Sequence, residues 1–414
     1  MSTTTQVGHA QGVWLGLAPM EGVTDFATRL WAAQNGAPDF TTTPFLRVTK
    51  DYPSRRISAN FLPEIDLPNY PGVVGCIPQL MASEIDDLIL IAKYFLERVP
   101  FVDINCGCPS PTVVGHGAGS SLLQTPERFR RYLESIVAEL GPQRVSVKMR
   151  VGFSRDEEFS RLLDVLKPLS LARVTIHGRT RADRYTGQAR WSFIEQAARV
   201  LNCPVVGSGD VLDAETFKAR IAQAPHVSGV IIGRGALRNP WIFSNLRDDC
   251  KPKIQVSRRL LKETLLQFIL LQELQSQCWD QFIEQTHKGI FVFDFDKQSE
   301  SSGERKEELN RRLAVDVLAK GESTAGFDVS RWPISRISLA RGKMLWNYLR
   351  SGLNASPELT VALLRAGDWT SFLPALERLL RALPDNDVEI GYHPQWDWVY
   401  SGAGQGASEE NKSG

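Results

Sequence analysis

The clearest candidate for chemistry in this sequence is Cys108, in the segment that reads DINCGCP over residues 103–109. The apolar run over residues 101–104 predicts a short buried strand just before it. A thiol at the end of a parallel strand lies where α/β enzymes keep their reactive groups. The alternative is that Cys108 is a small buried hydrophobic residue, which is the commoner role of a lone cysteine. The choice depends on the residues that follow the other predicted strands.

Residues that are unusual at the ends of strands, most of them polar or glycine, follow the other apolar runs. In chain order they are Pro19, Met20, Glu21, Gln79, Asn105, Lys148, His177, Arg179, Arg181, Ser208, Gly209, Asp210, Gly233 and Arg234. Each has a structural alternative, because Lys148 could pair with a carboxylate, His177 could be a core residue and the glycines could form tight turns. Together they favour an active site at one rim, where the loops after the last two strands commonly bind phosphate through backbone N–H groups.

Eight short apolar runs alternate with amphipathic helical segments and predict the fold. The runs cover residues 13–17, 40–45, 73–77, 101–104, 145–149, 174–176, 204–206 and 230–232. Eight such repeats within roughly 250 residues are typical of a (β/α)8 TIM barrel, which is an α/β fold. Thr125 and Pro126 form a helix-start signal before an apolar stripe that includes Phe129, Leu133 and Ile136.

Beyond the barrel the pattern becomes all-helical, with apolar periodicity over residues 260–274, 334–349, 357–364 and 369–380. We expect a flexible N-terminus over 1–12, the barrel over 13–250 and a C-terminal all-helical domain over 251–384. Residues 280–328 are polar and charge-dense, which indicates a solvated or disordered insertion with room for a short helix over 307–319. The tail over 385–414 is expected to be disordered at its end.

The composition excludes several classes of protein. The chain has 414 residues, 43% hydrophobic and 23% charged, as in an ordinary globular protein. A net charge of +1 gives no overall bias toward nucleic acid, so an RNA site requires local clustering. No apolar run is long enough to span a membrane, and the six scattered cysteines form neither a disulfide framework nor a zinc pattern. We expect a monomeric cytoplasmic protein with no membrane segment and no metal.

Motifs in both regions carry a resemblance to a known family. They read APMEGVTD over residues 18–25, DINCGCP over 103–109, VKMR over 147–150, HGRTR over 177–181 and IGRGA over 232–236. This set resembles the tRNA-dihydrouridine synthases, which are flavoprotein barrels. LARGK over 339–343, YLR over 348–350 and Thr112 in place of a common lysine resemble the bacterial subfamily that modifies uridine 16 of tRNA. One departure is Ser208, where the family usually has Asn, and it should alter one flavin-phosphate contact.

The resemblance implies FMN as the bound cofactor and NADPH as the hydride donor. Reduction of the C5–C6 double bond of uracil needs a hydride, which no side chain supplies, and a proton, which Cys108 would deliver as general acid. A thiol with an ordinary pKa of about 8.5 keeps its proton at neutral pH. The implied cofactor contacts are Lys148 and Gln79 at the ring, then His177, Ser208, Gly209, Gly233 and Arg234 toward the phosphate, with Pro19, Met20, Glu21 and Asp210 beside them.

The resemblance also implies a tRNA site. Its candidates are Asn105 and Tyr185 for the target uracil, Arg179 and Arg181 for the RNA backbone, and Arg336, Arg341, Lys343 and Arg350 in the helical domain. Arg336, Lys343 and Arg350 recur every seven residues and share one helix face, whereas Ile337, Met344 and Tyr348 are expected to pack inward. A solvated face is the commoner reason for such spacing. We favour phosphate contact, because the enzyme must hold a tRNA while a uridine turns into the barrel.

Two other functions remain open. A small-molecule FMN oxidoreductase of the dihydroorotate dehydrogenase type would share the flavin and a strand-end lysine. It does not need a basic helical domain, and the Gly-Cys-Pro thiol is less expected there. A non-catalytic RNA-binding barrel would tolerate loss of Cys108 or Lys148, and both residues are present.

Overall fold

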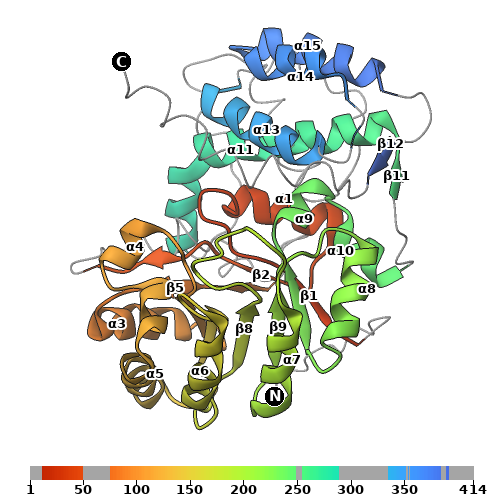
Figure 1. Ribbon diagram of the computed structural model, residues 1–414. Helices are drawn as coiled ribbons and strands as arrows, with labels where there is room; N and C mark the ends of the chain where they lie inside the picture. Colours follow the sequence, from red (N-terminus) through yellow and green to blue (C-terminus); the bar gives the residue numbers. More distant parts are fainter. Residues whose placement is uncertain are drawn as a thin grey trace, which may run out of the picture.

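The computed structural model describes residues 12–49, 75–248, 254–288, 334–350, 353, 355–383 and 388–390. Ten strand segments form one parallel sheet that curls into a barrel, and a layer of C-terminal helices lies against one end of it (Figure 1). The segments are β1 (Trp14–Leu17), β2 (Phe40–Thr42), β3 (Leu46–Arg47), β4 (Cys76–Ile77), β5 (Gln79–Met81), β6 (Val102–Cys106), β7 (Val145–Arg150), β8 (Arg173–His177), β9 (Val205–Ser208) and β10 (Gly229–Ile232).

The sheet closes through two interrupted strands. β2 and β3 are two parts of one extended segment, and so are β4 and β5, which only Pro78 separates. β2 pairs with β4 and β3 pairs with β5, and between these pairs Thr43 N donates to the carbonyl of Ile77 at 3.0 Å. Because proline has no N–H to donate, Pro78 accounts for the break in its strand. β5 pairs with β6 and β10 pairs with β1, so the segments make an eight-stranded closed barrel.

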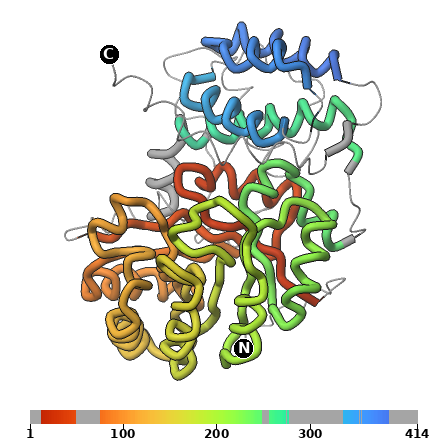
Figure 2. The backbone as a smooth tube through the Cα atoms, viewed as in Figure 1, coloured from red at the N-terminus to blue at the C-terminus, as the bar shows by residue number. Residues whose placement is uncertain are grey.

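Helices follow the strands of the barrel (Figure 2). They are α1 (Phe26–Gly36), α3 (Ile85–Leu96), α4 (Pro111–Gly115), α5 (Pro126–Leu140), α6 (Phe159–Leu166), α7 (Trp191–Val200), α8 (Ala214–Gln223), α9 (Arg234–Arg238) and α10 (Ile242–Asp248). The start of α5 is as predicted, with Pro126 in its first turn, where a proline costs no hydrogen bond. Its stripe of Phe129, Leu133 and Ile136 is buried, which fixes the helix against its neighbours.

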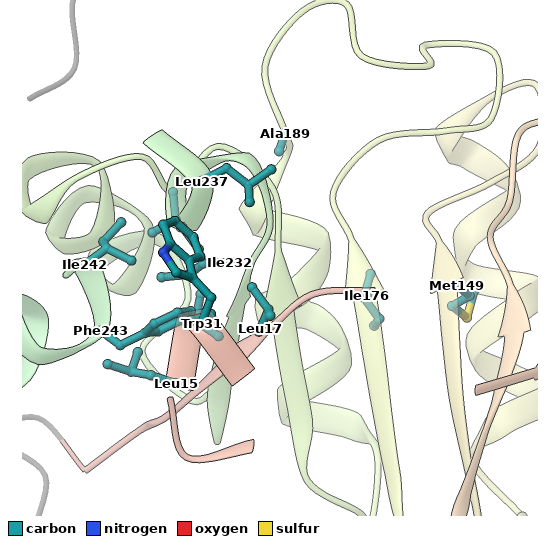
Figure 3. Close-up of a cluster of buried hydrophobic side chains, with 14 of the residues drawn as sticks. Leu15, Leu17, Trp31, Met149, Ile176, Ala189, Ile232, Leu237, Ile242 and Phe243 are labelled. Atoms are coloured by element: carbon teal, nitrogen blue, oxygen red, sulfur yellow. The ribbon is translucent and has the colours of Figure 1, made fainter. Parts of the chain in front are cut away.

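The C-terminal helices form the layer above the barrel. They are α11 (Arg258–Lys288), α13 (Arg336–Leu349), α14 (Pro357–Arg365) and α15 (Trp369–Arg381), and a short antiparallel pair joins β11 (Ile254–Val256) to β12 (Val388–Ile390). α1 lies between this layer and the barrel, and its Trp31 is fully buried. Figure 3 shows the Trp31 indole among Leu15, Leu17 and Phe243. Its ring also meets Phe268 of α11 edge-on, with the ring centres 5.3 Å apart. One continuous hydrophobic core therefore joins the barrel to the helical layer.

The predicted fold class, a TIM barrel followed by a helical region, is confirmed. Two expectations about single elements are wrong. The third strand does not end at Ile77, because it resumes after Pro78. Ile337 does not pack inward but is 71% exposed, whereas Met344 and Tyr348 do pack against the core.

The remaining differences concern the predicted ends of elements. The helix expected over residues 260–274 extends to Lys288 and so into the start of the expected insertion. The β11–β12 pair, whose second strand falls in the expected tail, was not anticipated. Residues 1–11, the short helix expected over 307–319 and most of the tail lie outside the described residues.

Candidate active site

A pocket of about 580 Å³ opens at the carboxyl ends of the barrel strands. Every residue that we assigned to proton donation or to cofactor binding lines it: Pro19, Met20, Glu21, Gln79, Cys108, Lys148, His177, Ser208, Gly209, Asp210, Gly233 and Arg234. Asn105 and Tyr185, the candidates for holding uracil, line it too. These residues meet because all strands of a parallel barrel point the same way, so their carboxyl ends share one rim. The structure gives their positions, and their roles stay predictions.

Hydrogen bonds from neighbouring side chains hold the loop that contains Cys108. The side-chain oxygen of Asn105 accepts from the backbone N–H groups of Gly107 at 3.0 Å and Cys108 at 2.9 Å. Ser120 Oγ donates to the carbonyl of Cys108 at 2.7 Å. Burial raises the pKa of the Cys108 thiol, and the N–H of Ser110 only partly opposes this shift. The sulfur therefore carries its proton at neutral pH, as a general acid requires.

Two cations from β7 lie beside this loop. Burial, together with the charge of Arg150, lowers the pKa of Lys148 from its ordinary value of 10.5 to about 8. Arg150 is buried and donates to the carbonyls of Gly107 at 2.9 Å, Thr180 at 2.9 Å and Arg184 at 3.0 Å. Arg150 therefore ties the cysteine loop to the loop after β8. Sequence reasoning noticed Arg150 without giving it a role, although its place two residues after Lys148 on the same strand was a usable signal.

The loop after β9 makes a compact turn beside His177. Gly209 has φ +118°, and a Cβ there would lie 2.7 Å from the Cβ of Ala189 and 2.9 Å from the His177 ring, so only glycine fits. Burial and the cations Arg150 and Lys148 hold the pKa of His177 well below its usual range, and its imidazole is neutral.

Arg179 is a structural residue behind this turn rather than a contact for RNA. It is 3% exposed and pairs with Asp210 at 2.7 Å, and its guanidinium also donates to the carbonyls of Thr186 and Gly187. A buried guanidinium whose donors are all directed inward has nothing to offer a phosphate in solvent. The prediction that Arg179 lies near the RNA backbone is therefore wrong. Arg181 is half-buried, with its guanidinium 5.0 Å from the ring centre of Phe153.

Arg234 and Tyr185 form the side of the pocket at the end of β10. The guanidinium of Arg234 lies 5.2 Å from the ring centre of Tyr185, and that of Arg150 lies 5.8 Å from it. Among the described residues, no carboxylate comes within ion-pair distance of Arg234. The pocket therefore contains a half-buried cation that is available to an anionic ligand.

Two of the four basic residues predicted to contact tRNA from the helical layer are used inside the protein. Arg341 forms an ion pair with Asp25 at 2.7 Å and donates to the carbonyls of Gly22 and Val23. Lys343 donates to the carbonyl of Ala366. These contacts occupy part of the hydrogen-bonding capacity of both half-buried cations, and a phosphate contact by Arg341 or Lys343 stays a prediction.

Arg336 and Arg350 remain open as phosphate contacts. Arg336 is exposed and Arg350 is half-buried, and within the described part of the chain neither has a carboxylate at ion-pair distance. Sequence reasoning also missed that Tyr348 of α13 lines the pocket, so the helical layer contributes a side chain to the site. The YLR segment and the inward-facing position marked Tyr348 in the sequence, but only the packing of α13 on the barrel brings its side chain to the pocket.

No helix among the described residues is both long and apolar enough to cross a lipid bilayer. Within the same residues, no group of three or more histidine, cysteine or acidic side chains could hold a metal ion.

The fold and the site together define a TIM-barrel enzyme with a buried thiol and a cation-rich pocket at its strand ends. The sequence model of the family described as Dihydrouridine synthase (Dus) matches residues 16–328. The chain therefore belongs to the dihydrouridine synthase family. Dihydrouridine differs from uridine by two hydrogens across the C5–C6 bond, so the enzyme is an oxidoreductase, as predicted.

Several relatives have similar sequences. A probable tRNA-dihydrouridine synthase of Aquifex aeolicus is 30% identical over 246 residues, which are 59% of this chain and 76% of that protein. A tRNA-dihydrouridine(16) synthase of Haemophilus ducreyi is 32% identical over 236 residues, 54% of this chain and 70% of that protein. A tRNA-dihydrouridine(47) synthase-like protein of Mus musculus is 38% identical over 164 residues, 39% of this chain and only 25% of the mouse protein.

Proposed function

We propose that this enzyme reduces the C5–C6 double bond of a D-loop uridine in tRNA, at position 16, with FMN as bound cofactor and NADPH as hydride donor. The observation that carries the proposal is the convergence, in one pocket, of a protonated thiol, a strongly perturbed lysine and two glycine turns. The thiol suits proton delivery to carbon, and the cations suit an anionic cofactor.

The residues present fit FMN. The phosphate of FMN is a dianion, and Arg234 is a half-buried cation beside the backbone of Gly233, where a Cβ would lie 3.3 Å from Met20 Sδ. Gly209 forms the facing turn, and the neutral His177 next to it can donate one hydrogen bond. Ser208, which stands where the family usually has Asn, keeps a hydroxyl at this position. We assign these residues to the phosphate end of the cofactor.

When bound, the flavin supplies the hydride for C6 of uracil, which no side chain can. Cys108 gives its proton to C5 of uracil, and Asn105 holds the Cys108 loop in place through its side-chain oxygen. Lys148 stabilises negative charge in the pocket, with the carboxylate of Asp103 and the guanidinium of Arg150 as its charged neighbours. Phe45, Tyr185 and Tyr348 are aromatic side chains of the pocket lining, and we assign the two tyrosines to stacking on a uracil turned into the site.

The choice of position 16 rests on the LARGK and YLR segments and on the extent of the match to relatives. The match covers 70% of the Haemophilus ducreyi tRNA-dihydrouridine(16) synthase but 25% of the mouse position-47 protein. The cytoplasmic location and the monomeric state stay predictions.

Dihydrouridine mapping on tRNA treated with the purified protein, FMN and NADPH tests the proposal. We expect a bound flavin with visible absorption, and modification of position 16 that disappears when this uridine is replaced by cytidine. Modification at position 47 or 20 instead would refute the assigned position while leaving the reaction in place. A protein that binds no FMN would refute the cofactor assignment, and with it the reading of the glycine turns.

A further inference from the structure

Asp103 is a buried carboxylate on β6 to which the proposed reaction gives no direct part. It is 1% exposed, and its neighbours across the sheet are Gln79 on β5 and Ser146 on β7. One carboxylate oxygen accepts from Ser146 Oγ at 2.5 Å, and the other accepts from Gln79 Nε2 at 2.7 Å. A charge this deep in a barrel is costly unless it is compensated. It raises the otherwise depressed pKa values of Lys148 and Arg173, which shows that both cations lie close enough to stabilise it.

A line of hydrogen bonds runs from Asp103 to the cysteine loop. Gln79 turns its amide nitrogen to Asp103 and its oxygen to Asn105, whose Nδ2 donates to it at 2.8 Å. Asn105 in turn accepts from the backbone N–H groups of Gly107 and Cys108. Every donor in the line is therefore directed toward Asp103.

The groups at the two ends of this line of hydrogen bonds, the Asp103 carboxylate and the backbone N–H groups of the cysteine loop, allow only this orientation of the two amides. An ionised carboxylate only accepts hydrogen bonds, and a backbone N–H only donates them. If the amide of Gln79 flipped, its oxygen would face the carboxylate and its N–H groups would face those of Asn105. A flipped Asn105 would likewise face the N–H groups of the cysteine loop. Buried polar atoms opposed in this way cost far more than the hydrogen bonds they replace.

We propose that Asp103 is a positioning residue that fixes the orientation of the Gln79 and Asn105 amides, so that one N–H of Gln79 remains for the flavin and the Cys108 loop is held in place. The inference rests on the proposed function in taking the ligand of this pocket to be FMN. Asp103 acts only through these two amides and touches neither the cofactor nor the uracil.

Three substitutions separate this role from simple packing. Asp103→Ala removes the acceptor, Asp103→Asn keeps an acceptor oxygen but removes the charge, and Ser146→Ala removes the other partner of the carboxylate. FMN affinity of the apo-protein and the visible absorption spectrum of the bound flavin are measured for each, with far-UV circular dichroism as the check of folding. We expect Asp103→Ala to weaken FMN binding about tenfold and to shift the flavin band, because the Gln79 N–H loses its acceptor and the amide is no longer held in place from that side. Asp103→Asn and Ser146→Ala should bind within about threefold of the wild type, with an unchanged band.

The same variants show how the inference fails. Wild-type affinity and spectrum in Asp103→Ala would overturn it while leaving FMN binding intact. A loss in Asp103→Asn as large as in Asp103→Ala would also overturn it, because the charge rather than the acceptor would then matter. If Asp103→Ala does not fold, Asp103→Asn alone decides the matter by the same threefold limit and the position of the band. A wild-type protein without FMN affinity would overturn the proposed function together with this inference.

Discussion

Lys148→Met should stabilise the cofactor-free protein while removing its activity. Burial and Arg150 lower the pKa of Lys148 from 10.5 to about 8. Protonating the amine is therefore less favourable in the folded barrel than in the unfolded chain, and the difference destabilises the folded state. Methionine has similar length and no charge. The substitution removes a penalty that exists only in the folded state, and it also removes the cation that the reaction uses.

The size of this effect follows from the shift in pKa. A shift of 2.5 units, at about 1.36 kcal/mol per unit, is a penalty of about 3 kcal/mol when Lys148 is protonated in both states. This penalty is complete below pH 8. As pH rises from 8 to 10.5, the unfolded chain holds more protons than the folded one, and wild-type stability rises relative to Lys148→Met. The advantage of the variant should therefore be largest at neutral pH and should fade above pH 10.

Urea unfolding of both apo-proteins at a series of pH values measures this difference, because their other titratable groups are shared. Lys93→Met is the matched control, since the Lys93 side chain is 56% exposed and pairs with Glu139 on the surface. The control should change stability by less than about 0.5 kcal/mol at every pH. A stability difference between wild type and Lys148→Met that does not vary with pH would refute the reasoning.

Three further predictions concern other parts of the site. Cys108→Ala should leave flavin reduction by NADPH intact and slow tRNA reduction about 100-fold, because a buried protonated thiol is lost. Stopped-flow measurement of the two half-reactions tests this, and an equal slowing of both would contradict it. Arg341→Ala should lower the unfolding free energy by about 1 kcal/mol through the loss of half-buried bonds to the loop after β1, whereas Arg336→Ala, at an exposed position, should not; equal urea midpoints would count against this. Gly209→Ala should lose bound flavin because its φ of +118° and the nearby Ala189 exclude a Cβ, whereas Gly75→Ala, which has open space, should stay yellow; a yellow Gly209→Ala protein would contradict the packing.

The sequence predicted the barrel and the pocket because both depend on short-range patterns. Apolar runs of three to six residues, each followed by glycine or polar residues, mark strand ends directly, and a parallel barrel brings those ends together. Lys148 and Gly209 could therefore be placed in one pocket from spacing alone, and the structure has both on its wall. Pro78 misled because a proline in an apolar run is usually a strand end, whereas here the strand resumes on its other side.

Charged residues were harder to assign from sequence. Arginine and lysine are usually exposed, so Arg179 and Arg341 were assigned to RNA. Their partners are Asp210, 31 residues away, and Asp25, 316 residues away, and no local pattern reveals a pair at such separations. Asp103 is also hard to assign from sequence. A single acidic residue inside an apolar strand does not indicate which side-chain amides it contacts.

The place of α1 between the barrel and the helical layer affects how new specificities could arise in this protein. Trp31 donates to the carbonyl of Thr264 at 3.0 Å, Asn35 donates to Gln267 at 2.9 Å, and the N–H of Ala27 donates to Gln275 at 2.8 Å. A recombination that exchanged only the C-terminal helices would leave these α1 groups without partners, because the surface of α1 is complementary to this particular α11. Exchanging the helical layer together with α1 would transfer both sides of the α1–α11 interface and keep these hydrogen bonds. We therefore expect that viable chimeras between such enzymes take their first helix from the parent that supplies the last ones, although the two lie more than two hundred residues apart in the chain.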